Sequence, residues 1–122
     1  MHTVLRLYLL ILGLYEFPNM WRCYTAMHSK APFTGFNSSM IPGAAEHRVW
    51  IFVLAMLAIS RFVAVALPDD PGALSNLALV HVAEAVYMGS ERLIYKSTGG
   101  NSVVLGIILA NGVLFVWLAI TA

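Results

Sequence analysis

The sequence has little charge. Only 11% of its 122 residues are Asp, Glu, Lys or Arg, whereas 60% are hydrophobic. Average soluble domains are about half apolar and about a quarter charged. A soluble domain of this length has a high surface-to-volume ratio, so these few charges could not cover its apolar surface. The shortage of charge predicts that lipid solvates most of the exterior, and the length allows one domain.

Other absences exclude several classes of function. The net charge is +1 without a basic cluster, which argues against a nucleic-acid partner. The single cysteine, Cys23, excludes an internal disulfide and a Cys-rich metal site. The sequence has four histidines, His2, His28, His47 and His81. These are too few for the clustered histidine boxes of membrane di-iron oxygenases. No Ser-His-Asp set or phosphate loop is visible, so we expect no catalytic, cofactor or metal site and no enzyme activity.

Long apolar runs are what the sequence does contain. A membrane-spanning helix needs roughly 20 mainly apolar residues. We expect four such spans, at 4–22, 49–67, 74–95 and 103–122, with a long polar loop at 24–47. The predicted fold is an all-α, integral membrane four-helix bundle that forms a single transmembrane domain, 1–122.

The first span is the least regular of the four. It contains Glu16, Pro18 and Asn19, so we expect a kink or fraying near its end. Its start resembles a signal peptide, but no small-x-small cleavage site follows, which favours a retained anchor. The second span is expected to end at the Pro68-Asp69-Asp70-Pro71 turn, because proline cannot continue a helix.

An even number of spans places both termini on one side of the membrane. Lys and Arg are more frequent in the long loop and in the loop between the third and fourth spans. The positive-inside rule therefore predicts that these two loops are cytosolic. Asn37 in the long loop also matches the N-glycosylation acceptor pattern, which is common by chance.

Several ionisable residues of the third span lie on one face of the expected helix. His81, Glu84, Met88, Glu91 and Tyr95 recur at steps of three and four. Ionisable groups within a span are costly and usually face the bundle interior with a partner. This stripe is therefore expected to face the other helices.

Arg61 and Arg48 of the second span are the expected partners of this stripe. Arg61 and Glu84 lie at comparable distances from the intervening turn, on the order of 10–15 Å into their helices. We predict an intramembrane ion-pair seam in which Arg61 meets Glu84 or His81, and Arg48 meets Glu91. The favoured interpretation is a structural contact that fixes helix register. The alternatives are a proton or ion path that includes Glu16, Glu84, Glu91 and His81, or contact with lipid headgroups or a partner subunit.

The fourth span carries small residues at close spacing. These are Gly106, Ala110, Asn111 and Gly112. Small residues let helices approach closely, and an asparagine can hydrogen-bond across a helix interface. We expect this face to serve internal packing or, alternatively, an oligomer or partner contact.

Short stretches along the chain resemble the ergosterol biosynthetic protein 28 family. They are Leu5-Arg6, the aromatic-Thr-Gly at Phe33-Thr34-Gly35, Arg48 followed by Arg61, and the stretch from Ser90-Glu91 through Tyr95 to Thr98. The resemblance implies a small four-span scaffold of the endoplasmic reticulum. Members of that family tether the sterol C-4 demethylation enzymes, a methyl oxidase, a decarboxylating dehydrogenase and a ketoreductase.

The sequence therefore predicts a non-enzymatic scaffold that holds other membrane proteins together. Its expected partners are the proteins of a multi-subunit complex and membrane lipids, and a homo-oligomer is an alternative. Because fold does not fix function, a second setting stays open, a supernumerary subunit of a mitochondrial respiratory or ATP synthase complex in the inner membrane. A proton- or ion-conducting transporter module is the third and least favoured alternative.

Overall fold

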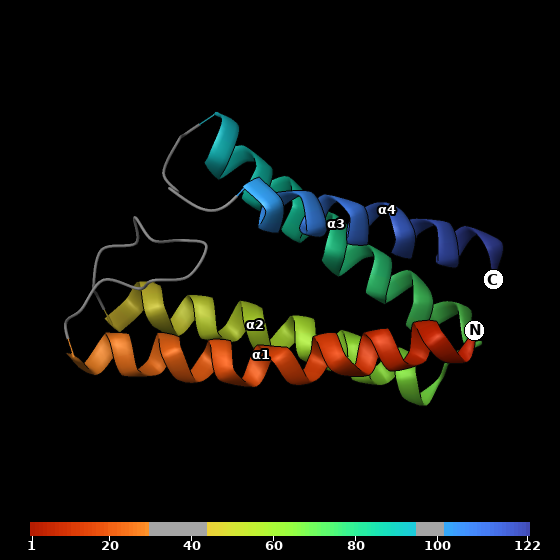
Figure 1. Cartoon of the computed structure of the whole chain (residues 1–122), viewed down its shortest axis with the longest axis horizontal. Helices are drawn as coiled ribbons and strands as arrows, with labels where there is room; N and C mark the ends of the chain where they lie inside the picture. The colour runs from red at the N-terminus through yellow and green to blue at the C-terminus, as the bar shows by residue number, and fades with distance from the viewer. Residues whose placement is uncertain (30–43, 95–101) are drawn as a thin grey trace.

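The computed structural model of the chain describes residues 1–29, 44–94 and 102–122, which form four α-helices (Figure 1). The helices are α1 (Thr3–Ser29), α2 (Ala44–Ala66), α3 (Pro71–Leu93) and α4 (Ser102–Thr121). These described residues include no β-strand. The all-α class with four helices, predicted from the apolar runs, is confirmed. Asn37 and Phe33-Thr34-Gly35 lie outside the described residues, as do Tyr95 and Thr98.

Helices that follow one another in the sequence pack against one another. α1 lies along α2, α3 lies along α4, and α2 contacts α3 less extensively. Figure 1 shows two helix pairs that are joined by the short turn between α2 and α3 and diverge toward the opposite end. Both chain ends lie at the end where the pairs are joined (Figure 1). This agrees with the expectation that an even number of helices brings the termini to one side.

The first helix is longer than expected. It continues through Pro18 to Ser29, so residues 24–29, which were expected to belong to the long polar loop, are helical. A proline inside a helix removes one backbone hydrogen bond and crowds the carbonyl group four residues earlier, at a cost of about 3 kcal/mol or more. The inward residues continue at helical spacing on both sides of it, as Leu9, Gly13, Glu16, Met20 and Cys23. Packing against α2 along this whole face stabilises the helix across the proline.

The turn between α2 and α3 contains the best-defined helix cap. α3 begins at Pro71, three residues before the predicted start of the third span at residue 74. Asp70 is the N-cap, and its side chain accepts a hydrogen bond of 2.7 Å from the backbone N–H of Ala73. Proline is favoured in the first turn of a helix because the N–H that it lacks would have no partner there. Pro71 therefore starts α3, whereas α2 has already ended at Ala66, before Pro68.

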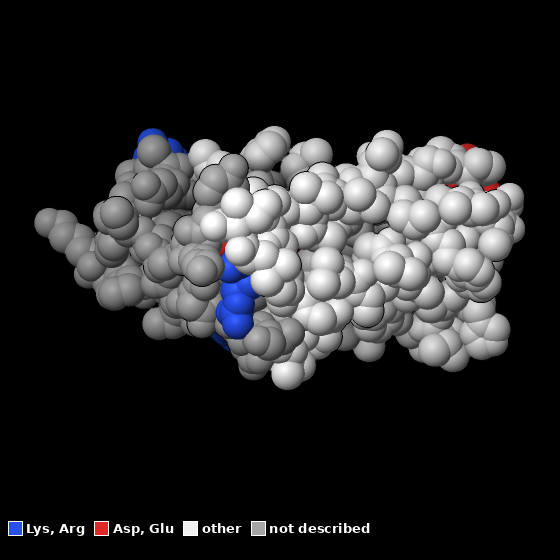
Figure 2. Space-filling view, turned by 90° about the horizontal axis from the view of Figure 1, so that it is seen from above, with Lys and Arg blue, Asp and Glu red and all other residues white. Residues whose placement is uncertain are grey.

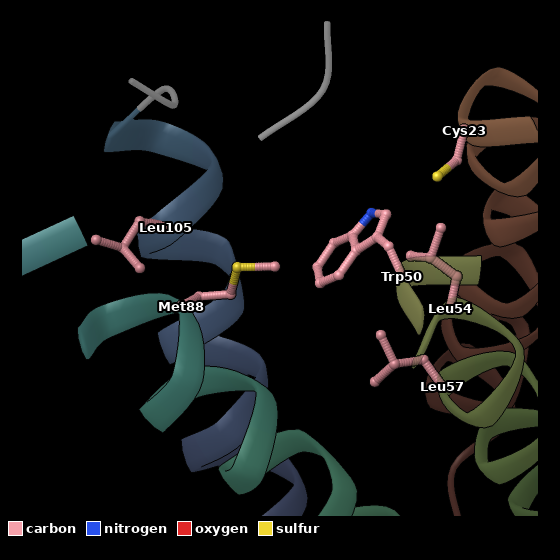
Figure 3. Close-up of a cluster of buried hydrophobic side chains, with 6 residues drawn as sticks. All are labelled: Cys23, Trp50, Leu54, Leu57, Met88 and Leu105. Carbon is pink, nitrogen blue, oxygen red and sulfur yellow. The ribbon is translucent and has the colours of Figure 1, made fainter. Parts of the chain in front are cut away.

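Two apolar clusters fill the interior. One lies toward the end where the pairs diverge and contains Cys23, Trp50, Leu54, Leu57, Met88 and Leu105. Figure 3 shows Trp50 of α2 pointing toward Met88 of α3, so these side chains connect the two pairs. The other cluster contains Leu9, Ala64, Leu77, Ala78, Phe115 and Leu118. All four helices contribute a buried residue to each cluster, so both clusters join the two helix pairs.

The outer surface of the helices is also apolar. Each helix has a large apolar side chain near its middle that is more than half exposed, at Ile11 (64%), Ile59 (57%), Leu79 (71%) and Val113 (73%). Figure 2 shows a broad surface on one face without Lys, Arg, Asp or Glu, with charged groups toward its ends. Two stretches, His47–Ala66 and Val103–Thr121, are long and apolar enough to cross a membrane by length and composition. This finding supports a membrane association for α2 and α4.

Candidate functional site

A cluster of buried polar groups lies between α1, α2 and α3. Its centre is Arg61 of α2, whose side chain is only 4% exposed. Glu16 comes from α1, and His81 and Glu84 come from α3. Removing a guanidinium and two carboxyl groups from solvent costs free energy, and only close contacts among these groups can offset that cost.

Glu16 is the nearest acidic partner of Arg61. The Nη1 group of Arg61 donates a hydrogen bond of 2.5 Å to Oε1 of Glu16 and one of 2.9 Å to the carbonyl oxygen of Leu12. The other carboxylate oxygen of Glu16 accepts from Asn19 Nδ2 at 3.5 Å. The Glu16 side chain is 8% exposed, so the ion pair is buried on both sides. Arg61 therefore joins α2 to α1 through a charged hydrogen bond and a backbone contact.

His81 connects the same guanidinium to α3. The Nε group of Arg61 donates to Nε2 of His81 at 3.0 Å, so this ring nitrogen carries no proton. The Nδ1 group then donates to the carbonyl oxygen of Leu77 at 2.8 Å. The imidazole is neutral in this arrangement, and its position is fixed further by an edge-on contact with Phe115 of α4 at 4.5 Å between ring centroids.

Glu84 lies one helical turn beyond His81 and farther from the arginine. Its Oε2 atom is 4.0 Å from Nη2 of Arg61, and its side chain is 12% exposed. This separation permits charge attraction but is too long for a hydrogen bond. His81 and Met88 are buried and Glu84 and Glu91 are partly buried, so the described part of the predicted stripe does face the helices.

The structure brings Arg61 to His81 and Glu84, as the spacing from the turn predicts, but it does not do the same for Arg48. Arg48 is exposed near the start of α2, and within the described residues it forms no ion pair with Glu91. Trp50, and not Arg48, is the residue at this level of α2 that faces α3, and its ring lies 6.3 Å from that of Tyr87 between centroids. Arg48 is on the exposed side of α2, so its side chain is not directed to the stripe of α3.

Sequence reasoning missed the role of Glu16. The irregular first span made this carboxylate a sign of a weak helix, whereas the structure makes it the closest acidic partner of Arg61. A signal was present, because an acidic residue inside an apolar run needs a cation of similar depth on a neighbouring helix. Arg61 is the only Lys or Arg within the middle of any of the four predicted spans.

The four residues of the predicted small-residue face of α4 do not all lie on the same side of the helix. Asn111 and Gly112 are buried. Asn111 accepts a hydrogen bond of 2.5 Å from the Tyr8 hydroxyl of α1, and Gly112 lies against α3 near Ala85. Gly106 and Ala110 are exposed on the outer side of the helix. Two of the four residues therefore serve internal packing, and the other two lie on the outer surface.

A shallow apolar groove of about 590 Å³ runs along the outside of the α3–α4 pair. Val82 and Val86 line one wall, and Leu109 and Val113 line the other. The groove carries no charged lining residue, so it is suited to hydrocarbon chains and not to a charged ligand. Across the described ranges, no group of three or more His, Cys, Asp or Glu side chains is placed to hold a metal ion.

Chemically, the site is a set of buried contacts that joins three helices. Comparison of the chain with protein-family models, with curated proteins and with solved structures found no match to any of them. The geometry of the cluster and the surface around it are therefore the basis for a functional proposal.

Proposed function

We propose that the chain is a multi-pass membrane scaffold without catalytic activity, which holds partner membrane proteins together. One observation carries this proposal. The charged groups near the middle of the helices point inward to one another, whereas the large side chains at the same level on the outside are apolar. A soluble protein has the opposite arrangement, since contiguous apolar patches on monomers rarely exceed a few hundred Å².

The buried cluster has a structural role in this proposal. A buried ion pair is weak support for stability, but losing one partner is strongly destabilising, so such a pair penalises wrong helix registers. Arg61 can satisfy Glu16, Leu12 and His81 together only when α1, α2 and α3 are aligned as observed. The result is a fixed framework whose outer surface is available to lipids and to other membrane helices.

The sequence resemblance suggests the setting of the scaffold. We assign it first to the endoplasmic reticulum, where its partners would be the sterol C-4 demethylation enzymes. The alternative is a supernumerary subunit of a respiratory or ATP synthase complex in the mitochondrial inner membrane. In both settings the exposed Gly106 and Ala110 of α4 would let a partner helix approach closely.

Co-purification from native membranes tests the scaffold and its setting. The tagged full-length chain is extracted in mild detergent, and the captured proteins are identified by mass spectrometry. Capture of the methyl oxidase, the dehydrogenase and the ketoreductase supports the first setting, and capture of respiratory or ATP synthase subunits supports the alternative. A chain that purifies alone or only with copies of itself contradicts the scaffold proposal.

Two matched variants make this test specific to the surface. Gly106→Leu together with Ala110→Leu fills the outer face of α4 and is expected to abolish partner capture while the chain still folds. The control, Ile107→Phe, enlarges a half-exposed side chain that lies to one side of the Gly106–Ala110 face on the same helix and should leave capture unchanged. Equal capture by both variants would place the partner contact elsewhere.

The buried carboxyl groups also define a test for a transporter. Proteoliposomes that contain the purified chain are given a pH gradient, and the loss of the gradient is followed with an internal dye. The scaffold proposal predicts the same rate as protein-free vesicles. A faster loss that Glu84→Gln abolishes would favour proton conduction instead.

A further inference from the structure

The buried cluster has two carboxyl groups but only one permanently charged cation, the guanidinium of Arg61. Within the described residues, its ionisable side chains are Glu16, Arg61, His81 and Glu84. If both carboxyl groups were ionised, two negative charges would share one guanidinium, because the contacts of His81 keep its imidazole neutral. Protonation of His81 at Nε2 would place a hydrogen against the Nε–H group of Arg61 and break that hydrogen bond. The imidazole therefore does not supply the missing positive charge.

Arg61 is committed to Glu16 rather than to Glu84. The hydrogen bond to Glu16 is 2.5 Å long, whereas the nearest approach of Glu84 is 4.0 Å. The attraction that Arg61 exerts on an ionised Glu84 is opposed by repulsion from the carboxylate of Glu16. Two carboxyl groups that share one site do not both ionise readily. Removal from water disfavours the charged form further, since the Glu84 side chain is 12% exposed.

We propose that Glu84 is a proton-binding site and that its carboxyl group is neutral at pH 7 in the folded protein. The groups that face it are Glu16 from α1, Arg61 from α2 and His81 from its own helix, and the described part of α4 brings no charged residue. A metal cation does not fit here, because the guanidinium 4.0 Å away repels it and the described residues offer no metal-binding group of side chains. The proton is the cation that balances the cluster.

The same charge count makes the two acids interdependent. If Glu16 is made neutral, Arg61 loses its counter-ion, and Glu84 is the remaining carboxyl group within 4.0 Å of the guanidinium. Glu84 then gives up its proton and becomes the partner of Arg61. If burial alone kept Glu84 neutral, the neutralisation of Glu16 would not make Glu84 lose its proton. The inference does not depend on the scaffold role, since it concerns the interior of the chain alone.

Labelling with dicyclohexylcarbodiimide tests the proposal in liposomes that contain the full-length chain. This apolar reagent adds the O–H group of a neutral carboxylic acid across its C=N bond and does not add a carboxylate. Fragmentation mass spectrometry then locates the adduct and separates Glu84 from Glu91. We expect labelling of Glu84 at pH 7, loss of that label in Glu84→Gln, and no label on Glu16.

The decisive variant is Glu16→Gln. It is expected to abolish labelling of Glu84, although it leaves Glu84 itself unchanged. The matched control is Asn19→Ala, which removes the weak 3.5 Å contact on the far side of Glu16 but leaves its charge, and should keep the label. Continued labelling of Glu84 in Glu16→Gln would overturn the charge-sharing argument.

Infrared spectroscopy gives an answer that does not depend on reagent access. The difference spectrum between the native chain and Glu84→Gln at pH 7 should show the carbonyl stretch of a protonated carboxylic acid that is lost in the variant. Loss of carboxylate bands instead would overturn the proposal, whatever the labelling result. The same spectrum recorded on the Glu16→Gln background should show the carboxylate form of Glu84.

Discussion

At the scale of single residues, Arg61 determines how the polar interior is arranged. Its guanidinium contacts a carboxylate on α1, a backbone carbonyl on α1 and a histidine on α3. Arginine suits this position because its planar group offers five donors in fixed directions, whereas lysine offers one compact charge. The contacts on α1 use Nη1 and the contact on α3 uses Nε, two separate nitrogen donors that the single ammonium of Lys does not provide.

Replacement of Arg61 by Met tests how much this residue contributes to the stability of the fold. The change leaves the buried carboxylate of Glu16 without its counter-ion, and breaking a buried pair in this way costs about 3–5 kcal/mol. The free energy of unfolding, measured by denaturant titration in detergent micelles, should fall by this amount. The double variant Arg61→Met, Glu16→Gln should recover part of the loss, because it removes the uncompensated charge as well. An unchanged free energy in the single variant would contradict the buried pair.

At the scale of helices, the close approach of α1 and α2 depends on a glycine. A Cβ atom at Gly13 would lie 2.7 Å from Cε1 of Phe62 on α2, and that ring also stacks on Phe17 with 6.2 Å between centroids. Gly13→Ala should therefore force the ring to shift and lower the free energy of unfolding by about 1–3 kcal/mol, as overpacking does.

Gly106 provides the matched control for this prediction. A Cβ atom at Gly106 has no neighbour within 4 Å, so Gly106→Ala meets no steric obstacle. Alanine is the better helix former by about 1 kcal/mol, so the variant should be as stable as the native chain or more stable. The two substitutions are chemically the same, and equal effects would show that the close approach of α1 and α2 is not as described.

The cap of α3 is a second feature at this scale. Asp70→Ala removes the acceptor for the Ala73 N–H group and should lower the free energy of unfolding by about 0.5–2 kcal/mol. Asp70→Asn keeps an acceptor oxygen at the same place and should restore most of the loss. If Asn is no better than Ala, the side chain does not cap the helix.

The helices could be predicted from the sequence, whereas their ends and their interhelical contacts could be predicted only in part. Runs of apolar residues gave the number and order of helices, and the depth of Arg61 and Glu84 gave one interhelical contact. The start of α3 was missed because Pro71 was counted with the turn that follows α2, whereas it occupies the first position of the next helix. The continuation of α1 past Pro18 and the outward position of Arg48, away from Glu91, are tertiary effects, which local pattern does not contain.

At the scale of the whole molecule, α1 and α4 are joined chiefly by side chains, since their backbones do not approach closely. The Tyr8 hydroxyl donates to Oδ1 of Asn111 across this gap. Tyr8→Phe should cost about 1 kcal/mol, a usual net value for a hydrogen bond. A double-mutant cycle with Asn111→Leu should give a coupling energy of similar size, and additive effects would contradict the contact.

Placement of all four helices in the membrane is the central claim, and spin-label accessibility tests it most directly. In a Cys23→Ser background, single cysteines replace Ile11, Ile59, Leu79 and Val113, one exposed apolar residue near the middle of each helix. Each is spin-labelled in liposomes, and its collisions with oxygen are compared with those with a water-soluble nickel chelate. The account predicts that oxygen dominates at all four sites, while a label at Asp69 in the α2–α3 turn collides more with nickel. More frequent collisions with nickel at positions 11 and 79 would show that α1 and α3 lie outside the bilayer and contradict the account.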